Sequence, residues 1–182
     1  IRICLVGSEM CIRDSIGTLP LRVDVPGSDL DIALQSADLD RTAARLRTHY
    51  GHHTGFTLEQ GTTQGAPSLT AAFTLDGLPV ELFASPLSLS QQNGVAHYFI
   101  EADLLGLLGA DFREAVMSRR ANGMNTEPAF ADVLQLPGDA YDALLTLRQV
   151  SDAALTMRWK GLRPNESAPD TCLLYTSDAA DE

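Results

Sequence analysis

Apolar and polar residues alternate in the first half of the chain, and this pattern predicts β-strands. In residues 29–34, leucine and isoleucine alternate with aspartate and alanine, which is the period of a half-buried strand. Residues 68–75 and 79–84 are typical of a hairpin, because the Asp-Gly pair between them favours a tight turn. A short strand is also expected at residues 56–59. Together these segments place a sheet within about residues 16–84.

Helical periodicity occurs once between the strands and dominates the second half of the chain. Residues 38–50 are expected to form a helix, because they carry an apolar stripe on one face. Asp38 is its expected N-cap, and Gly51 is expected to end it. Further helices are expected at residues 93–108, 111–121, 126–134 and 139–157, the last two with Thr126 and Asp139 as N-caps. Strands that precede helices in this way predict one α+β domain, with a helical C-terminal layer at about residues 91–160.

Composition and charge narrow the classes of function. The chain has 182 residues, of which 45% are hydrophobic and 20% charged, and this suits one globular domain. No apolar run reaches the roughly 18 residues needed to span a bilayer, so we expect no membrane association. Aspartate and glutamate number 24 against 13 lysines and arginines, for a net charge of −11. This excess of acid disfavours nucleic acid as a partner.

The two ends of the chain differ from its middle. Residues 1–15 and 171–182 contain all three cysteines and resemble peptides translated from sequencing-adapter DNA in metagenomic assemblies. A signal peptide at the start is disfavoured, because charged residues interrupt the apolar stretch and no small-residue cleavage site follows. We therefore expect the natural domain to cover about residues 16–170. That segment contains no cysteine, which fits a reducing cytoplasm.

Three acidic residues on the predicted strands are the main candidates for chemistry. Asp29 and Asp31 are two residues apart, so their side chains leave the same face of a strand. Two like charges cannot share an apolar core without neutralisation. Glu81 lies between two apolar residues of the predicted hairpin, and the three carboxylates meet on one surface if that strand lies beside the first. Such hard oxygen ligands suit Mg²⁺, which completes its shell with water and substrate phosphates.

Other interpretations of these residues stay open at this point. Asp29 and Asp31 could lie at a solvated strand edge or in a calcium-binding loop, although the regular ligand spacing of such a loop is missing. Glu81 could be an exposed strand residue. Upstream, Gly17 and Thr18 could form an ordinary turn, or they could let the backbone approach a phosphate closely.

The order of these motifs matches a known pattern. The chain resembles the nucleotidyltransferase superfamily of the DNA polymerase beta type in three segments, which are Gly17-Thr18, Asp29-Leu30-Asp31-Ile32 and Val80-Glu81-Leu82. The resemblance implies a mixed β-sheet core, with Mg²⁺ or Mn²⁺ as cofactor. It also implies that Asp29 and Asp31 bridge two metal ions and that Glu81 holds the catalytic one. The Gly-Thr pair would hold a nucleoside triphosphate.

A closer resemblance covers nearly the whole predicted domain. It is to a small bacterial family that is catalogued only as a domain of unknown function with a nucleotidyltransferase-like fold. The resemblance is carried by residues 17–34, 80–93 and 125–145, with His97 and Glu101. Members of that family have a first strand before the Gly-Thr pair. We therefore expect residues 11–16 to form this strand here.

Further residues are candidates for contact with the substrate. We assign three to this role, Arg22, Ser28 and His97. His97 shares a helix face with Glu101, four residues later, which fits either a substrate contact or an ordinary helix pair. The Arg119-Arg120 pair fits a solvated helix face better than a phosphate clamp. The histidines among residues 49–53 fit a polar loop better than a zinc site, since no cysteine ligands accompany them.

The sequence thus predicts a metal-dependent nucleotidyltransferase. A nucleotidyl group would pass from a nucleoside triphosphate to a hydroxyl of a small molecule or a protein, with the metal ions activating the attacking oxygen. The alternative is a catalytically degenerate member of the same fold that binds a nucleotide or a partner protein. The two differ in whether Mg²⁺ or Mn²⁺ binds together with a triphosphate.

Overall fold

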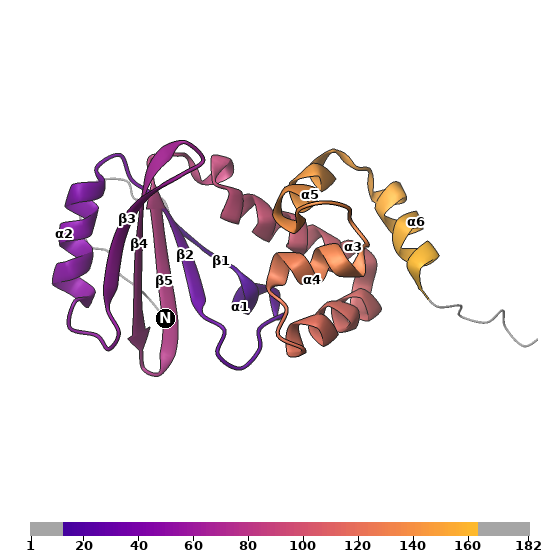
Figure 1. Ribbon diagram of the computed structural model, residues 1–182, viewed down its shortest axis with the longest axis horizontal. Coiled ribbons are helices and arrows are strands. Elements are labelled where there is room, and N and C mark those ends of the chain that lie inside the picture. The colour runs from indigo at the N-terminus through magenta and orange to yellow at the C-terminus, as the bar shows by residue number, and fades with distance from the viewer. Residues whose placement is uncertain (1–12, 164–182) are drawn as a thin grey trace, which may run out of the picture.

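The structure, a computed structural model, describes residues 13–163. They form a sheet, one helix packed on it and a group of helices beside it (Figure 1). The strands are β1 (Arg13–Ile16), β2 (Leu30–Gln35), β3 (Thr57–Thr63), β4 (Ala66–Leu75) and β5 (Leu78–Ser85). The α-helices are α1 (Thr18–Leu21), α2 (Leu39–Tyr50), α3 (Asn93–Ala121), α4 (Thr126–Val133), α5 (Ala140–Thr146) and α6 (Asp152–Leu162). Two short 3₁₀ helices, η1 (Leu89–Gln91) and η2 (Leu147–Gln149), lie between them.

The sheet is mixed, which confirms the predicted α+β class. Its strand order is β1-β2-β5-β4-β3. Strands β2 and β5 are parallel, and all other neighbours are antiparallel. The parallel pair brings together two segments that lie far apart in the sequence, and these are the segments that carry the predicted acidic site.

Helix α2 covers one face of the sheet (Figure 1). It begins as predicted, because the Asp38 side chain accepts a hydrogen bond from the Arg41 backbone N–H at 2.9 Å. The predicted stripe faces the sheet, and Ala43, Leu46 and Tyr50 are buried in one cluster with apolar residues of β2, β4 and β5. Burial of this stripe, at about 25 cal/mol per Å² of apolar surface, fixes α2 on the sheet.

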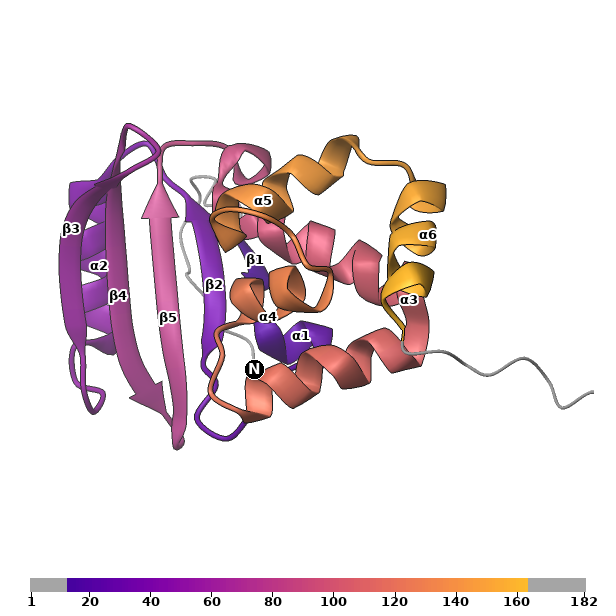
Figure 2. The same ribbon diagram turned by 45° about the vertical axis from the view of Figure 1, so that its right-hand side comes forward.

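The helices of the second half enclose a separate core (Figure 2). Phe112 of α3 and Phe130 of α4 are fully buried there, with ring centroids 5.7 Å apart in an edge-to-face contact. Helix α3 bends at Gly109, whose φ of 81° and ψ of −161° are not helical. The break lies between the two helices predicted at residues 93–108 and 111–121, so the sequence locates the bend correctly. Within residues 13–163, no helix is both long and apolar enough to cross a bilayer.

The β4–β5 hairpin has its predicted turn. Asp76 and Gly77 both have positive φ, at 50° and 84°, as a type I′ turn requires. The first strand is β1, from residue 13, and residues 11 and 12 of its predicted span lie outside the described residues. Strand β1 pairs antiparallel with β2, so residues 13–15 join the sheet, and the domain boundary at residue 16 stays a prediction.

Two predictions about the helices are wrong. The single helix expected at residues 139–157 is divided into α5 and α6, because Val150 is extended and Ser151 caps a new helix by accepting a hydrogen bond from the Ala154 N–H. Asp139 caps α5 as expected. Thr126 is the first residue of α4 rather than its N-cap, which is Asn125.

Candidate functional site

A cavity of about 900 Å³ lies between the sheet and the helices. Its lining comes from β2, β5, the loop before β2, the first turns of α3 and α4, and the beginning of α5. Seven of the residues predicted for the site line it, namely Gly17, Thr18, Ser28, Asp29, Asp31, Glu81 and His97. Arg22 does not, since it is exposed at the end of α1 and its carbonyl accepts a hydrogen bond from Arg113. The structure therefore brings together all of the predicted site except Arg22.

The carboxylates of Asp31 and Glu81 are neighbours across the parallel pair. The two residues are register partners of β2 and β5, so their side chains leave the same face of the sheet. Asp29 directly precedes β2. Burial, with the negative charges of Asp29, Glu81 and Glu127, raises the pKa of Asp31 to about 7. Burial and Asp29 also raise the pKa of Glu81. The three acids thus form a cluster of negative charge.

The donor atoms of this cluster suit a divalent cation. All are carboxylate oxygens, the ligands that Mg²⁺ and Mn²⁺ prefer, and an opposing cation would offset the repulsion that raises their pKa values. In the described residues, Asp29, Asp31 and Glu81 form neither a hydrogen bond nor an ion pair through their side chains. Across residues 13–163, however, no three or more His, Cys, Asp or Glu side chains lie close enough together to form a ready metal site.

Gly17 and Thr18 lie directly beside the acidic cluster. Gly17 has φ 80° and ψ −158°, a conformation essentially restricted to glycine. A Cβ atom there would clash with Asp31 Oδ2, so any other residue would displace the Asp31 carboxylate from its present position. The Thr18 hydroxyl is buried and has no hydrogen-bond partner among the described residues. It is therefore a donor available to a ligand in the cavity.

Gly17→Ala should weaken both the fold and the binding of a divalent cation. The strained backbone should lower the free energy of unfolding by about 1–3 kcal/mol. Displacement of the Asp31 carboxylate should weaken Mn²⁺ binding about 10- to 100-fold, which is the usual effect of changing a residue that positions a metal ligand. Denaturant unfolding and Mn²⁺ titration measure the two effects.

Gly77→Ala is the matched control for this change. Gly77 has a similar φ of 84°, but a Cβ there would meet nothing within 4 Å. We expect it to lose stability while binding Mn²⁺ like the wild type. If Gly17→Ala also bound Mn²⁺ like the wild type, the contact with Asp31 would have no role in the site.

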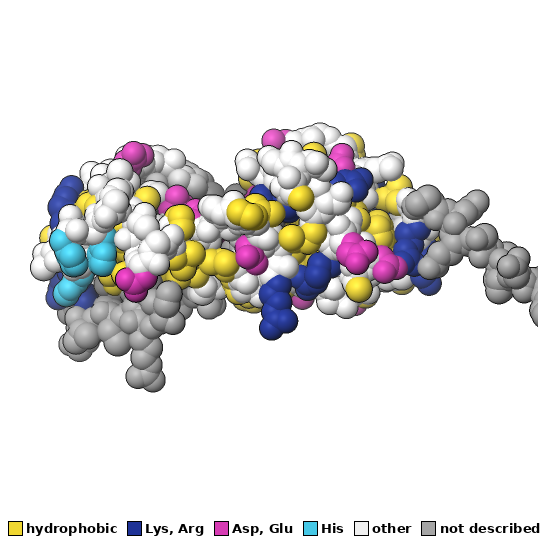
Figure 3. Space-filling view, turned by 90° about the horizontal axis from the view of Figure 1, so that it is seen from below, with side chains coloured by type: hydrophobic (Ala, Val, Ile, Leu, Met, Phe, Trp, Pro, Cys, Tyr) yellow, Lys and Arg dark blue, Asp and Glu magenta, His cyan; other side chains and the backbone are white. Residues whose placement is uncertain are grey.

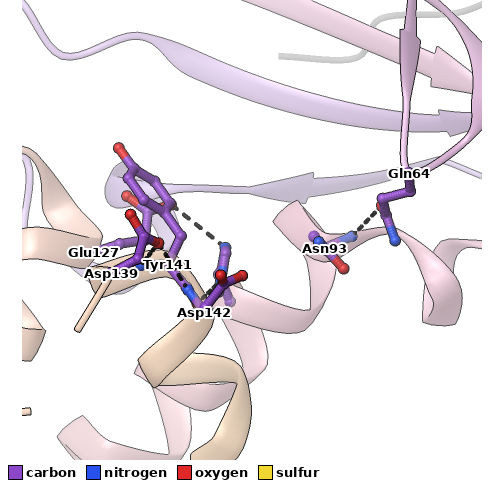
Figure 4. Close-up of polar contacts among 7 residues, drawn as sticks. Gln64, Asn93, Glu127, Asp139, Tyr141 and Asp142 are labelled. Atoms are coloured by element: carbon purple, nitrogen blue, oxygen red, sulfur yellow. Dashed lines mark hydrogen bonds and ion pairs between the residues drawn. The ribbon is translucent and has the colours of Figure 1, made fainter. Parts of the chain in front are cut away.

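The helical wall of the cavity carries a second polar group. His97 of α3 is buried, its Nε2 lies 3.0 Å from the Tyr141 carbonyl oxygen, and its Nδ1 lies 3.7 Å from Glu127 Oε1. Figure 4 shows Glu127 and Tyr141 on this wall. Glu101, one helical turn after His97, is only 2% exposed. Burial and the neighbouring Glu127 raise the pKa of Glu101 to about 8, against a lowering effect of Arg120.

Arg120 anchors the loop that leads to β2. Its guanidinium donates to the carbonyl oxygens of Met124 at 2.9 Å and Val23 at 3.4 Å, and to the Ser28 hydroxyl at 3.5 Å. The prediction of a solvated helix face is therefore wrong for Arg120. The same prediction of a solvated helix face fits Arg119, which is partly exposed and forms an ion pair with Asp132 at 3.0 Å. The loop that carries Asp29 is thus held by the helical part.

A glutamine that the sequence does not single out connects the β3–β4 turn to α3. The Gln64 side chain accepts a hydrogen bond from the Asn93 N–H at 2.8 Å (Figure 4). It also donates one to the Gln91 carbonyl oxygen at 2.8 Å. The neighbouring Gln92 is buried and donates to the carbonyl oxygens of Leu34 and Leu87. These amides fix the first turn of α3, and with it His97, relative to the sheet. No local pattern marks Gln64 or Glu127 as part of the site.

The histidines that follow α2 belong to a different part of the molecule. They gather at one end of the surface (Figure 3). The His53 ring stacks on Phe73 at 5.4 Å, and the His52 and His53 rings lie 4.3 Å apart. None of them lines the cavity. These contacts pack the segment after α2 against β4.

Comparison with known proteins places residues 13–147 in a family. They match the model of a family described as "Domain of unknown function (DUF4269)". This confirms the expectation of a family without an assigned function, while its bacterial origin stays a prediction. No curated protein matches the chain.

Several solved structures are similar to the chain at low sequence identity. The Cid1 poly(U) polymerase bound to MgGTP is 11% identical with a TM-score of 0.46, and the match covers 75% of this chain and 42% of that one. The polymerase core of TRAMP, an RNA surveillance complex, is 13% identical with a TM-score of 0.43, covering 82% and 50%. A chain of the GLD-2/RNP-8 complex is 12% identical with a TM-score of 0.49, covering 84% and 68%. The match thus spans less than half of the first of these proteins, and likeness at this level says nothing about activity or substrate.

Proposed function

We propose that this chain, which belongs to the DUF4269 family of unknown function, transfers a nucleotidyl group from a nucleoside triphosphate to an acceptor hydroxyl. One observation carries the proposal. Asp31 and Glu81 lie side by side on parallel strands, next to Asp29, in a cavity where no basic side chain of the described residues forms an ion pair with them. An uncompensated acidic cluster of this kind is costly to the fold unless it binds something.

Each residue of the cluster has a defined task in this proposal. Asp29, Asp31 and Glu81 would hold Mg²⁺ or Mn²⁺, and such an ion lowers the pKa of the acceptor hydroxyl and stabilises the charge on the departing pyrophosphate. The buried Thr18 hydroxyl would donate to a phosphate oxygen, and Gly17 leaves space for it and for Asp31. Ser28 and His97 would contact the substrates from the loop and from α3. Arg22 receives no task, because it lies outside the cavity lining.

The reaction forms one bond and breaks one. The acceptor oxygen attacks the α-phosphorus, and the bond from that phosphorus to the oxygen bridging to the β-phosphorus breaks. Pyrophosphate leaves, and the hydroxyl proton passes to solvent. The protein contributes position and electrostatics, and no covalent intermediate with a side chain is required.

A transfer assay with each of the four α-³²P-labelled nucleoside triphosphates tests this function. We expect label to enter a small molecule or the protein itself in the presence of Mg²⁺ or Mn²⁺, and the reaction to stop with a chelator. Absence of transfer with every nucleotide, combined with absence of pyrophosphate release, would contradict the proposal.

A non-catalytic, nucleotide-binding member of the same fold is the second candidate. The observation that favours it is the lack of a ready three-ligand cluster within residues 13–163. Such a protein would bind a triphosphate without releasing pyrophosphate. The same assay, run beside a nucleotide-binding titration, separates the two functions.

A further inference from the structure

The helical wall of the cavity carries two acids that nucleotidyl transfer itself does not require. Glu101 lies on α3, and Glu127 lies in the first turn of α4. Both line the cavity, on the side formed by the helices. Glu127 is close enough to both Asp31 and Glu101 for its charge to raise the pKa of each. Glu127 therefore lies near both the proposed metal-binding acids and the buried carboxyl of α3.

Glu101 has an oxygen that lacks a partner. The residue is 2% exposed, and its Oε1 is buried without a hydrogen bond among the described residues. Buried polar atoms are nearly always paired, so an unpaired carboxyl oxygen beside the cavity indicates a missing donor. Arg120, whose charge acts on Glu101, does not supply this donor, because its guanidinium donates to Val23, Met124 and Ser28.

The charges along the cavity point to the kind of donor that is missing. Five carboxylates line it, against one arginine and one histidine. Two divalent cations and a nucleoside triphosphate largely offset each other's charge, so the bound nucleotide leaves the acidic excess in place. A molecule that enters beside the nucleotide therefore meets a negative field. Positive charge on that molecule would be attracted, and negative charge would be repelled.

We propose that the acceptor is a cationic amino alcohol, whose ammonium group binds at Glu101 and Glu127 while one of its hydroxyls faces Asp29, Asp31 and Glu81. The inference rests on the proposed function and specifies the substrate class of that same site. The ammonium supplies the donor that Glu101 Oε1 lacks, and its positive charge favours release of the proton that the buried carboxyl holds when no acceptor is bound. The positive charge also distinguishes this class of acceptor from a nucleic acid that offers a ribose hydroxyl, because the acidic wall would repel the phosphates of the nucleic acid.

The transfer keeps the amine intact. The hydroxyl oxygen of the acceptor forms the new bond to the α-phosphorus, pyrophosphate leaves with the electrons of the broken bond, and the hydroxyl proton goes to solvent. The product is a nucleotidylated amino alcohol that retains its positive charge.

Binding of matched pairs of sugars tests the charge preference. Glucosamine is compared with glucose, and the β-1,4-linked glucosamine disaccharide with cellobiose, by calorimetry on the full chain with Mg²⁺ and an α,β-methylene triphosphate. We expect the amino sugars to bind at least about tenfold more tightly, as a charge-assisted hydrogen bond provides. Glu127→Gln and Glu101→Gln should each remove most of this preference. Glu114→Gln is the control, since Glu114 is exposed on α3 and does not line the cavity.

Asp31→Asn separates this inference from the proposed function. It should abolish transfer and leave the preference for amino sugars in place. Equal affinity for both members of each pair, or a preference that persists in both Glu127→Gln and Glu101→Gln, would overturn the inference even if transfer to other acceptors occurs. If the preference depends on Glu127 but wild-type protein transfers label to no acceptor, the proposed function is wrong, and the ammonium site is not an acceptor site.

Discussion

Asp31→Asn should abolish nucleotidyl transfer and make the cation-free protein more stable. The amide keeps the shape of the side chain but removes the charge that the metal ions need, and we expect the rate to fall at least about a hundredfold. Without a cation, Asp31 is repelled by Asp29, Glu81 and Glu127. Removing its charge relieves that repulsion, as is common where an active site is costly to the fold.

The opposite signs of the two effects make this result informative. Transfer is measured with α-labelled nucleotide, and stability by denaturant unfolding in the presence of a chelator. Asp24→Asn is the matched control, because Asp24 is exposed and lies outside the cavity lining. A variant at residue 31 that transfers label at the wild-type rate would eliminate the residue from the mechanism. A loss of stability instead of a gain would show that the carboxylate has a structural partner.

Glu101→Gln should prevent a loss of stability that the wild-type protein undergoes as the pH rises. Burial raises the pKa of Glu101 to about 8, so the folded protein holds a proton that the unfolded chain releases above its ordinary pKa of 4.5. The free energy of unfolding therefore decreases as the pH rises from 4.5 to about 8, by up to about 1.4 kcal/mol per pH unit. The glutamine has no proton to lose, and the variant should exceed the wild type in stability at pH 9.

Unfolding free energies at pH 5 and pH 9 measure this difference. We expect the two proteins to differ little at pH 5 and by a few kcal/mol at pH 9. Glu114→Gln, an exposed position on the same helix, should follow the wild type at both values. If the Glu101→Gln variant lost as much stability as the wild type between pH 5 and pH 9, the conclusion that Glu101 is buried in its neutral form would be wrong.

The acidic strands could be predicted from the sequence because their signals are local. Alternation in residues 29–34 set the inward and outward faces of β2, and the Asp-Gly pair set the β4–β5 turn. The neighbouring positions of Asp31 and Glu81 needed one further assumption, that their strands pair, and the parallel register confirms it. The Gly17-Thr18 pair could be placed near Asp31 only through the family resemblance.

The contacts of the helical wall could not be predicted, because they join residues that are distant in the sequence. Glu127 reaches His97 from another helix, and Gln64 reaches Asn93 from a strand turn. The division of the last predicted helix depends on the extended Val150 and the cap at Ser151, where no proline or glycine interrupts the helical pattern. The helical pattern predicts a solvated face for Arg120, because two of its partners, Val23 and Ser28, lie in a loop more than ninety positions earlier.

The most direct test of the acidic cluster is a Mn²⁺ titration followed by electron paramagnetic resonance. It is run with each of the four α,β-methylene nucleoside triphosphates, on wild-type protein and on Asp31→Asn, with free nucleotide alone as the baseline. Our account predicts that wild-type protein removes more Mn²⁺ from solution than nucleotide alone, and that Asp31→Asn does not. Identical titrations of the two proteins with all four nucleotides would contradict it.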